Sequence, residues 1–256
     1  MKQFLPQSPL LPDGRVILSG KDYHYLVRVR RVKTGDTINA VLPDGADARL
    51  TVISVGKDTL TCAAGKAATE NPVPDARPSI ILLQALPRPA KMDLLVRQAA
   101  EGGVRVIVPF TGRHSVKEAG TSSRLERWRR IVREARQQSG SPVATTVADI
   151  CQNAAAALDY YRKTRTGNTA ALVLHERTSG ADGVLHRALA SSPEQVFIAI
   201  GPEGGLADDE TATFIENEFI MASMGENVLR VETAAAWAVG IVSVILREAA
   251  FWKLKE

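Results

Sequence analysis

The sequence contains few cysteines and few histidines, which restricts the chemistry that it can carry. Only Cys62 and Cys151 occur among 256 residues, and they lie far apart. A disulfide framework needs several spaced cysteines, and a structural zinc site needs clustered cysteine and histidine ligands. Neither is indicated, and we expect no metal.

Long apolar runs are also missing. No stretch of about eighteen uninterrupted apolar residues is available to cross a bilayer. The residues that follow Met1 do not form the apolar core of a signal peptide. We therefore expect a cytoplasmic protein with no membrane partner.

Two phosphate-binding motifs are absent as well. The chain has neither the Walker A pattern nor the dinucleotide pattern G-x-G-x-x-G. The positive charge is modest, at +4 with a pI near 9.2, which is compatible with a nucleic-acid partner but does not establish one. Apolar residues make up 45% of the chain, enough for a sizeable core in one large domain or two smaller ones.

The most informative stretch is Gly-Pro-Glu-Gly-Gly at residues 201–205, which follows an apolar strand at 196–200. A second turn at 224–229 follows the next predicted strand, at 219–222. Ligands of open α/β sheets bind beyond the carboxyl ends of the strands, so two turns at consecutive strand ends predict the walls of one pocket. Glu203, Glu226 and Glu232 would lie in it, with Arg230 as its only cation. That composition favours a ligand with hydrogen-bonding edges over a polyphosphate.

These paired turns resemble the cofactor loops of the SPOUT methyltransferases, and most closely those of the bacterial RsmE family. The resemblance rests on residues 201–205, followed by Gly225, Val228-Leu229-Arg230 and Glu232-Thr233-Ala234. It implies methylation of N3 of one uridine in 16S rRNA of the small ribosomal subunit, with S-adenosyl-L-methionine as cofactor. It also implies a trefoil knot and a homodimer.

The resemblance assigns roles to residues of three loops. His175 and Glu176, after a predicted strand at 170–174, would flank the adenosine. The full predicted cofactor set is Leu174, His175, Glu176, Ile200, Gly201, Pro202, Glu203, Gly204, Gly205, Met224, Gly225, Asn227, Val228, Leu229, Thr233 and Ala234. Arg230 and Glu232 are the predicted catalytic residues. Arg230 would stabilise the deprotonated uracil or hold its phosphate, whereas removal of the N3 proton is open between Glu232 and Glu203.

The N-terminal part is predicted to be a small antiparallel β-barrel. Short alternating runs at 15–18, 37–42, 49–55 and 59–62 are separated by turns. A short helix at 22–33 leads to a basic end, and the resemblance makes this part a PUA-like RNA-binding domain at residues 1–71. Its predicted RNA contacts are His24, Arg28, Arg30, Arg31 and Lys33. Alternatively, this stretch is a solvated turn with its tyrosines in the core.

A proline-containing linker at 65–79 separates the barrel from a second domain, at residues 75–256. Near-continuous apolar strands at 80–86, 104–109, 144–147, 170–174, 196–200 and 219–222 alternate with helical patterns. This alternation predicts an α/β fold with a parallel sheet covered on both faces. The fold class is therefore a PUA-like barrel followed by a SPOUT domain.

Two helices of this domain carry further predictions. The helix at 122–138 bears an apolar stripe and many arginines, of which Arg129, Arg133 and Arg136 are predicted to contact RNA; a solvated face is the alternative. The closing helix, from 233 to about 252, is apolar all round and predicts burial by its own sheet and by a second subunit.

The chain departs from the family pattern at three positions. Gly102 replaces a usual Leu, Ser141 a common Arg, and Ala207 the usual Ser or Thr cap, so Asp208 is predicted to cap the next helix. Two rival functions are a SPOUT enzyme with another target nucleotide and a non-catalytic RNA-binding or ribosome-assembly protein.

Overall fold

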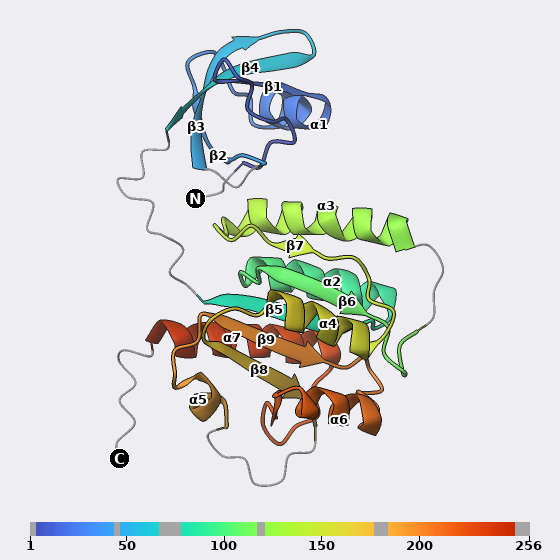
Figure 1. The fold of residues 1–256 in the computed structure, drawn as a ribbon. Helices are drawn as coiled ribbons and strands as arrows, with labels where there is room; N and C mark the ends of the chain where they lie inside the picture. The colour runs from blue at the N-terminus through green and yellow to red at the C-terminus, as the bar shows by residue number, and fades with distance from the viewer. Residues whose placement is uncertain (1–3, 44–46, 67–77, 117–120, 177–183, 249–256) are drawn as a thin grey trace. The chain divides into compact units, whose positions relative to one another are not determined.

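The chain forms two compact units, which Figure 1 shows as a ribbon. The computed structural model describes residues 4–43, 47–66, 78–116, 121–176 and 184–248. The first unit comprises Met1–Pro74 with Arg136–Pro142, and the second comprises Asp75–Ala135 with Val143–Glu256. Most of the predicted linker, including the predicted boundary between 71 and 75, lies outside the described residues.

The first unit is built on a four-stranded antiparallel sheet. Its strands are β1 (Arg15–Ser19), β2 (Thr37–Val41), β3 (Asp47–Val55) and β4 (Thr59–Lys66), in the order β1-β4-β3-β2. Side chains alternate along β1: Val16 and Leu18 are buried and their neighbours are exposed, as the period of two requires. The four predicted strands are confirmed, with ends that differ by a few residues.

The helix between β1 and β2 is shorter than predicted and ends in a π-helix. It consists of α1 (Gly20–Tyr23) and η1 (His24–Val29), so it stops four residues before the predicted end at 33. The reason is the backbone at Arg31, whose φ of 56° is left-handed and cannot continue a right-handed helix. Tyr23 is buried and donates a hydrogen bond from its hydroxyl to the Gly56 carbonyl at 2.9 Å. It therefore belongs to the core of the unit.

The second unit contains a six-stranded sheet in which every neighbouring pair is parallel, as predicted. The strands are β5 (Ser79–Ala85), β6 (Val106–Phe110), β7 (Thr146–Val147), β8 (Thr169–Leu174), β9 (Gln195–Ile200) and β10 (Ile220–Ala222). Their order is β10-β8-β9-β5-β6-β7. β6 begins two residues later than predicted. The trefoil knot stays a prediction.

Helices cover both faces of this sheet (Figure 1). One apolar cluster joins the sheet to α2 (Pro89–Glu101), α3 (Thr121–Ser139), α5 (Val184–Leu189) and α7 (Val231–Glu248). The cluster on the other face includes residues of α4 (Ala154–Thr164) and α6 (Asp208–Glu216). The prediction of a sheet covered on both sides is confirmed. No described helix is long and apolar enough to cross a membrane.

A glycine is needed at position 102 because α2 packs closely on α7 here. It is the C-cap of α2, and a Cβ at this position would lie only 2.9 Å from Cγ1 of Val239. A leucine here would overlap α7, so this departure from the family pattern is explained by helix packing. α7 itself begins at Val231, two residues before the predicted start, and its predicted end at 252 lies outside the described residues.

Candidate active site

The loops that follow three adjacent strands line one cavity of about 1070 Å³. β10, β8 and β9 lie side by side in that order, so β8 separates the two strands whose turns were predicted to be neighbours. The 175–176 loop therefore lies between the two glycine-rich turns. Nevertheless, both turns contribute to the same cavity.

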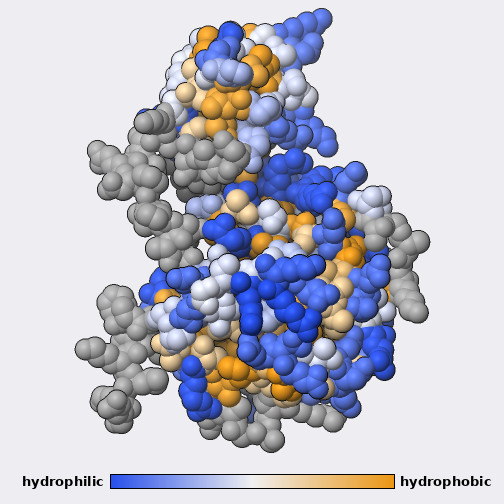
Figure 2. Space-filling model, in the orientation of Figure 1, coloured by the Kyte–Doolittle hydropathy of each residue, from blue (hydrophilic) through white to orange (hydrophobic). Residues whose placement is uncertain are grey.

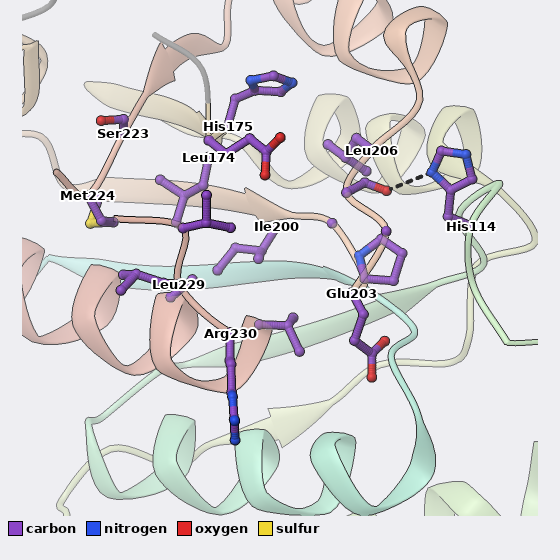
Figure 3. Close-up of a pocket in the computed structure, with 18 of the residues that line it drawn as sticks. His114, Leu174, His175, Ile200, Glu203, Leu206, Ser223, Met224, Leu229 and Arg230 are labelled. Carbon is purple, nitrogen blue, oxygen red and sulfur yellow. Dashed lines mark hydrogen bonds between the residues drawn. The ribbon is translucent and has the colours of Figure 1, made fainter. Parts of the chain in front are cut away.

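Nearly all the residues predicted for the cofactor meet at this cavity (Figure 3). Its lining includes Leu174, His175, Glu176, Ile200, Gly201, Pro202, Glu203, Gly204, Gly205, Met224, Gly225, Asn227, Val228, Leu229 and Ala234. Thr233 and Glu232 are described but do not belong to the lining, whereas Arg230 does. Whether these residues hold a cofactor stays a prediction.

The glycine-rich loop is folded back so tightly that one position accepts only glycine. A Cβ at Gly201 would lie 2.6 Å from the backbone nitrogen of Leu206, and backbone cannot move aside as a flexible side chain can. Gln84, fully buried in β5, donates from its amide nitrogen to the carbonyls of Ala85 at 2.8 Å and Gly201 at 3.2 Å. The loop is thus fixed to the centre of the sheet.

His114 lies against this loop from the segment after β6. Its Nδ1 is 3.2 Å from the Gly205 carbonyl, which can only accept, so Nδ1 is the donor (Figure 3). A Cβ at Gly204 would lie 3.1 Å from Cβ of His114. His114 therefore closes one side of the cavity against a residue that has no side chain.

A lysine lies between two of the predicted carboxylates. Nζ of Lys91, in the first turn of α2, is 3.4 Å from Oε1 of Glu203 and 3.8 Å from Oε2 of Glu232. The Glu203 carboxylate also accepts from the Arg88 N–H, at 3.2 and 3.3 Å for its two oxygens. Burial alone would raise the pKa of Glu203, but its own N–H, that of Arg88 and Lys91 together lower it. Glu203 is consequently held ionised.

The prediction that Arg230 is the only cation of the pocket is wrong. Lys91 and Arg113 line the cavity as well. The side chain of Arg230 is exposed and makes no hydrogen bond or ion pair with any residue that the structure describes. Figure 3 shows it extending to the same side of the pocket as Glu203. Arg230 is therefore available to an anionic or polar ligand.

The prediction that Asp208 caps α6 is wrong. The N-cap is Ala207, which has no side-chain acceptor, and Asp208 is already the first helical residue. Glu210 supplies the returning half of a capping box, because its Oε2 accepts from the Ala207 N–H at 3.0 Å. Its Oε1 accepts from the Arg113 N–H at 2.9 Å. One carboxylate thus ties α6 to the loop that carries His114.

The predicted RNA contacts of the first unit all lie on the surface of the same short segment. The side chains concerned are exposed, namely His24, Arg28, Arg30, Arg31 and Lys33. Their positive charge is therefore presented to solvent, as phosphate contact requires. The RNA role itself stays a prediction.

The predicted contacts on α3 are less uniform. Arg129 is exposed and lies 3.7 Å from Asp149, Arg133 is half-buried, and Arg136 is buried. Figure 2 shows mainly hydrophilic side chains over α3 in this view. The exposed arginine Arg129 fits the prediction better than Arg136, which lies four residues after the buried Val132 and so beside the apolar stripe of the helix. Ser141, the second departure, is buried, and its N–H donates to Ser139 Oγ at 3.2 Å.

The sequence reasoning missed several residues of the site. Lys91, Arg113 and His114 line the cavity, and Gln84 fixes its central loop. Gln84 carried a signal, a single polar side chain inside an apolar strand. Lys91, Arg113 and His114 lie about ninety or more residues before the partners that they contact, so their place at the cavity depends on the fold of the chain.

Neither cysteine takes part in the site. Burial raises the pKa of the Cys62 thiol to about 11. Burial, together with the charges of Asp149 and Asp159, also raises that of Cys151. Both thiols are therefore weak nucleophiles at neutral pH. Among the described residues, no group of three or more His, Cys, Asp or Glu is placed to hold a metal ion.

Comparison with known proteins places these features in one family. Residues 75–243 match the model of the RNA methyltransferase domain, and residues 18–64 match that of the RNA methyltransferase PUA domain. The ribosomal RNA small subunit methyltransferase E of Mycobacterium bovis is 31% identical over 92% of this chain and 89% of its own. The protein of that name from Bacillus subtilis is 26% identical over 88% of each chain.

A solved structure supports the fold. The crystal structure of a ribosomal RNA small subunit methyltransferase E from Neisseria gonorrhoeae, bound to S-adenosyl methionine, superimposes with a TM-score of 0.79 at 24% identity. The match covers 96% of this chain and 98% of that one. With a PUA domain, a parallel α/β sheet and loops that converge on one cavity, the chain belongs to the RNA methyltransferase family.

Proposed function

We propose that this protein transfers a methyl group from S-adenosyl-L-methionine to N3 of one uridine in 16S rRNA. The observation that carries the proposal is the cavity of about 1070 Å³ lined by three loops at adjacent strand ends, with Arg230 exposed at its wall. Such crevices are where α/β sheets bind their ligands. The volume lies slightly above the range for small-molecule sites, roughly 300–1,000 Å³, which suits a cofactor together with a target base.

The lining fits the proposed cofactor chemically. Glycines 201, 204, 205 and 225 bring bare backbone to the cavity, and Leu174, Ile200 and Leu229 add apolar surface. Backbone amides and carbonyls suit the edges of adenine, while the carboxylates of the lining suit a positively charged sulfonium. When bound, the cofactor supplies an electrophilic methyl group. The protein's part is to orient the two reactants and to stabilise charge on the uracil.

Within the proposal, Arg230 and the two glutamates have different tasks. Arg230, which has no partner among the described residues, would stabilise the negative charge that develops on the uracil when N3 loses its proton. Glu203 is a weak proton acceptor because its pKa is lowered by the N–H groups and the lysine around it. Glu232 is set back from the cavity lining. Both carboxylates help to hold the site in shape, and the acceptor of the N3 proton stays a prediction that is open between Glu232 and Glu203.

RNA is proposed to bind through the basic segment of the first unit and the exposed arginines of α3. The support is the exposure of His24, Arg28, Arg30, Arg31 and Lys33, together with Arg129. Phosphate contacts of this kind position an RNA, and bases that are not in a helix can then be reached. We place this activity on the small ribosomal subunit in the cytoplasm.

A homodimer is also part of the proposal. On α7, Trp237 and Val244 are 51% and 48% exposed, although both are large and apolar. They lie seven residues apart, on one face of the helix. A second copy of the chain would cover this face, as the resemblance to the SPOUT family implies.

Mapping of methylated nucleotides in 16S rRNA from a deletion strain tests the proposal. A uridine N3-methyl group should disappear, return with the wild-type gene and fail to return with Arg230→Ala. Loss of a different modification would favour a SPOUT enzyme with another target. No loss would favour a non-catalytic RNA-binding or ribosome-assembly protein.

Calorimetric titration tests the cofactor separately. Gly204→Val places a branched side chain against His114, at a position where even a Cβ is 3.1 Å from the nearest atom. We expect affinity for S-adenosyl-L-methionine to fall by about tenfold or more, the effect of a lost close fit. Gly65→Val, in β4, is the control, because only the Arg49 carbonyl, at 3.7 Å, lies near its Cβ position. Unchanged affinity in folded Gly204→Val would refute the pocket assignment.

A further inference from the structure

Lys91 connects three separate elements at the wall of the cavity. It belongs to α2, Glu203 to the loop after β9, and Glu232 to the first turn of α7. The side chains are only 30%, 27% and 14% exposed, so their charges are partly removed from water. Charge pairs in such positions are less screened than those on an open surface.

The two carboxylates depend on Lys91 to different degrees. Glu203 has other donors, since both of its oxygens accept from the Arg88 N–H. Oε2 of Glu232 is buried, and no hydrogen-bond donor among the described residues reaches it. Its one ion pair in the described chain is with Lys91, at 3.8 Å. Replacing Lys91 would therefore destabilise mainly the carboxylate of Glu232, because a buried carboxylate without a counter-charge is costly.

Glu232 is rigidly connected to Arg230. The carbonyl of Arg230 accepts a hydrogen bond of 2.8 Å from the Ala234 N–H, so the first turn of α7 runs from Arg230 through Glu232. A movement of Glu232 would consequently move the backbone from which the Arg230 side chain extends. In contrast, the Gly201–Gly205 loop keeps its own attachments through Gln84 and Arg88.

We propose that Lys91 is a positioning residue that acts through Glu232 to fix Arg230 at the cavity. The inference rests on the proposed methyl transfer, because Arg230 has its role there. The proposal assigns the rate of methyl transfer and the affinity for the cofactor to different parts of the site. Lys91 sets the rate of methyl transfer, whereas affinity for the cofactor depends on the neighbouring loop.

The test compares Lys91→Met, Lys91→Arg and the control Lys163→Met in the full chain. Lys163 is an exposed lysine on α4 that makes no ion pair with a described residue. Lys91→Met should lower kcat by about tenfold or more, the effect of a misplaced catalytic group. The dissociation constant of this variant for S-adenosyl-L-methionine, measured by calorimetry, should change by less than about threefold. The reason is that Lys91 is linked to the glycine-rich loop only through a partly exposed ion pair with Glu203, and such pairs are weak. Lys91→Arg should restore most of the lost turnover.

A double-mutant cycle identifies the carboxylate through which Lys91 acts. Lys91→Met combined with Glu232→Gln should lose no more activity than the worse single variant, because the buried charge has been removed with its partner. Lys91→Met combined with Glu203→Gln should come closer to additive losses, because Glu203 keeps the Arg88 N–H as a partner when Lys91 is lost. The opposite pattern would overturn the proposal, as would a rise in KM for rRNA at unchanged kcat, which would mean that Lys91 contacts RNA directly.

Thermal unfolding of the ligand-free protein tests the role of Lys91 independently of whether the protein transfers methyl groups. Lys91→Met should lower the unfolding midpoint by about 2–4 °C, and Glu232→Gln in that background should recover part of the loss. If the wild-type protein bound no cofactor and transferred no methyl group, the proposed function would fail. The thermal cycle would still decide whether Lys91 acts through Glu232, and simple additivity there would overturn the inference.

Discussion

The charge of Glu203 is maintained by groups that the fold brings to it, and this makes the stability of the loop dependent on pH. The pKa of Glu203 is lowered from 4.5 because, despite burial, its own N–H, that of Arg88 and the Lys91 ammonium favour the ionised form. A lowered carboxyl pKa contributes stability that is fully present above the unfolded value and is lost as the pH falls through the folded value. The contribution therefore exists at neutral pH and is lost progressively as the pH falls below the ordinary value of 4.5 and through the lower pKa of the folded protein.

We predict that Glu203→Gln costs roughly 1 kcal/mol of unfolding free energy at pH 7, since the group is partly exposed. The difference from the wild type should stay constant down to about pH 5.5 and should shrink as the pH falls further. Urea unfolding at several pH values measures it. Glu216→Gln, at an exposed residue of α6, is the matched control and should have little effect. A difference that persists unchanged at pH 3 would contradict this explanation.

For single residues, the sequence predicted those site residues that belong to short local motifs. The glycines, Glu203 and Arg230 could be assigned to one pocket because two short motifs have a specific spacing. Lys91 and His114 could not, because their partners are brought near by the order of the strands. Glu232 was assigned to catalysis from its motif; its side chain lies beside Lys91, behind the cavity lining, and its catalytic role stays a prediction.

At the scale of elements, the basic segment around η1 carries the strongest prediction about RNA. Arg28, Arg30 and Arg31 are exposed, and Arg31 is held in a left-handed backbone conformation that turns the chain at this point. Changing all three to glutamine should weaken rRNA binding and reduce the slope of log affinity against log salt by about 2, since each lost phosphate contact in a single strand removes roughly 0.7. Filter binding at several salt concentrations measures both quantities.

The control for this experiment is Arg97→Gln combined with Lys163→Gln, at exposed positions of α2 and α4 that were not predicted to contact RNA. It removes positive charge without touching the segment. A triple variant that binds as tightly as the wild type, with the same salt slope, would show that the segment is only a solvated turn.

Element types were predictable because the periods of apolar residues differ between strands and helices. The alternating runs gave the antiparallel sheet, and the continuous runs gave the parallel one. The ends were less accurate where the backbone conformation decides them, as at Arg31.

At the scale of the whole molecule, the sequence predicted the parallel sheet but not its order. β8 lies between β9 and β10, although β9 and β10 follow one another in the chain. Nothing in the composition of these strands distinguishes a neighbour in space from a neighbour in sequence. The same limit applies to α7, whose apolar residues predicted burial by its own sheet and by a second subunit without showing which face meets which.

In the part of the chain that the structure describes, one side of α7 is buried and another is exposed. Val239, Val242 and Ile245 belong to the apolar cluster, whereas Trp237 and Val244 are about half exposed. Full burial of such a side chain is worth about 1.5–3 kcal/mol, and roughly half of that is still to be gained for each, because both are already about half buried. A second copy that covers this face would recover it.

We therefore predict that Trp237→Glu dissociates the dimer while the fold is kept, because the side chain is exposed within one chain and such substitutions usually change stability by less than about 0.5 kcal/mol. Sedimentation at low micromolar concentration should show a dimer for the wild type and a monomer for the variant, and methyl transfer should fall with the loss of the dimer. Ile215→Glu is the matched control: this residue is 44% exposed on α6, on the opposite face of the sheet, and the variant should remain dimeric and active. A wild-type protein that sediments as a monomer and methylates rRNA at full rate would show that the exposed face of α7 needs no partner. A Trp237→Glu monomer that keeps full activity would show instead that dimerisation serves stability alone.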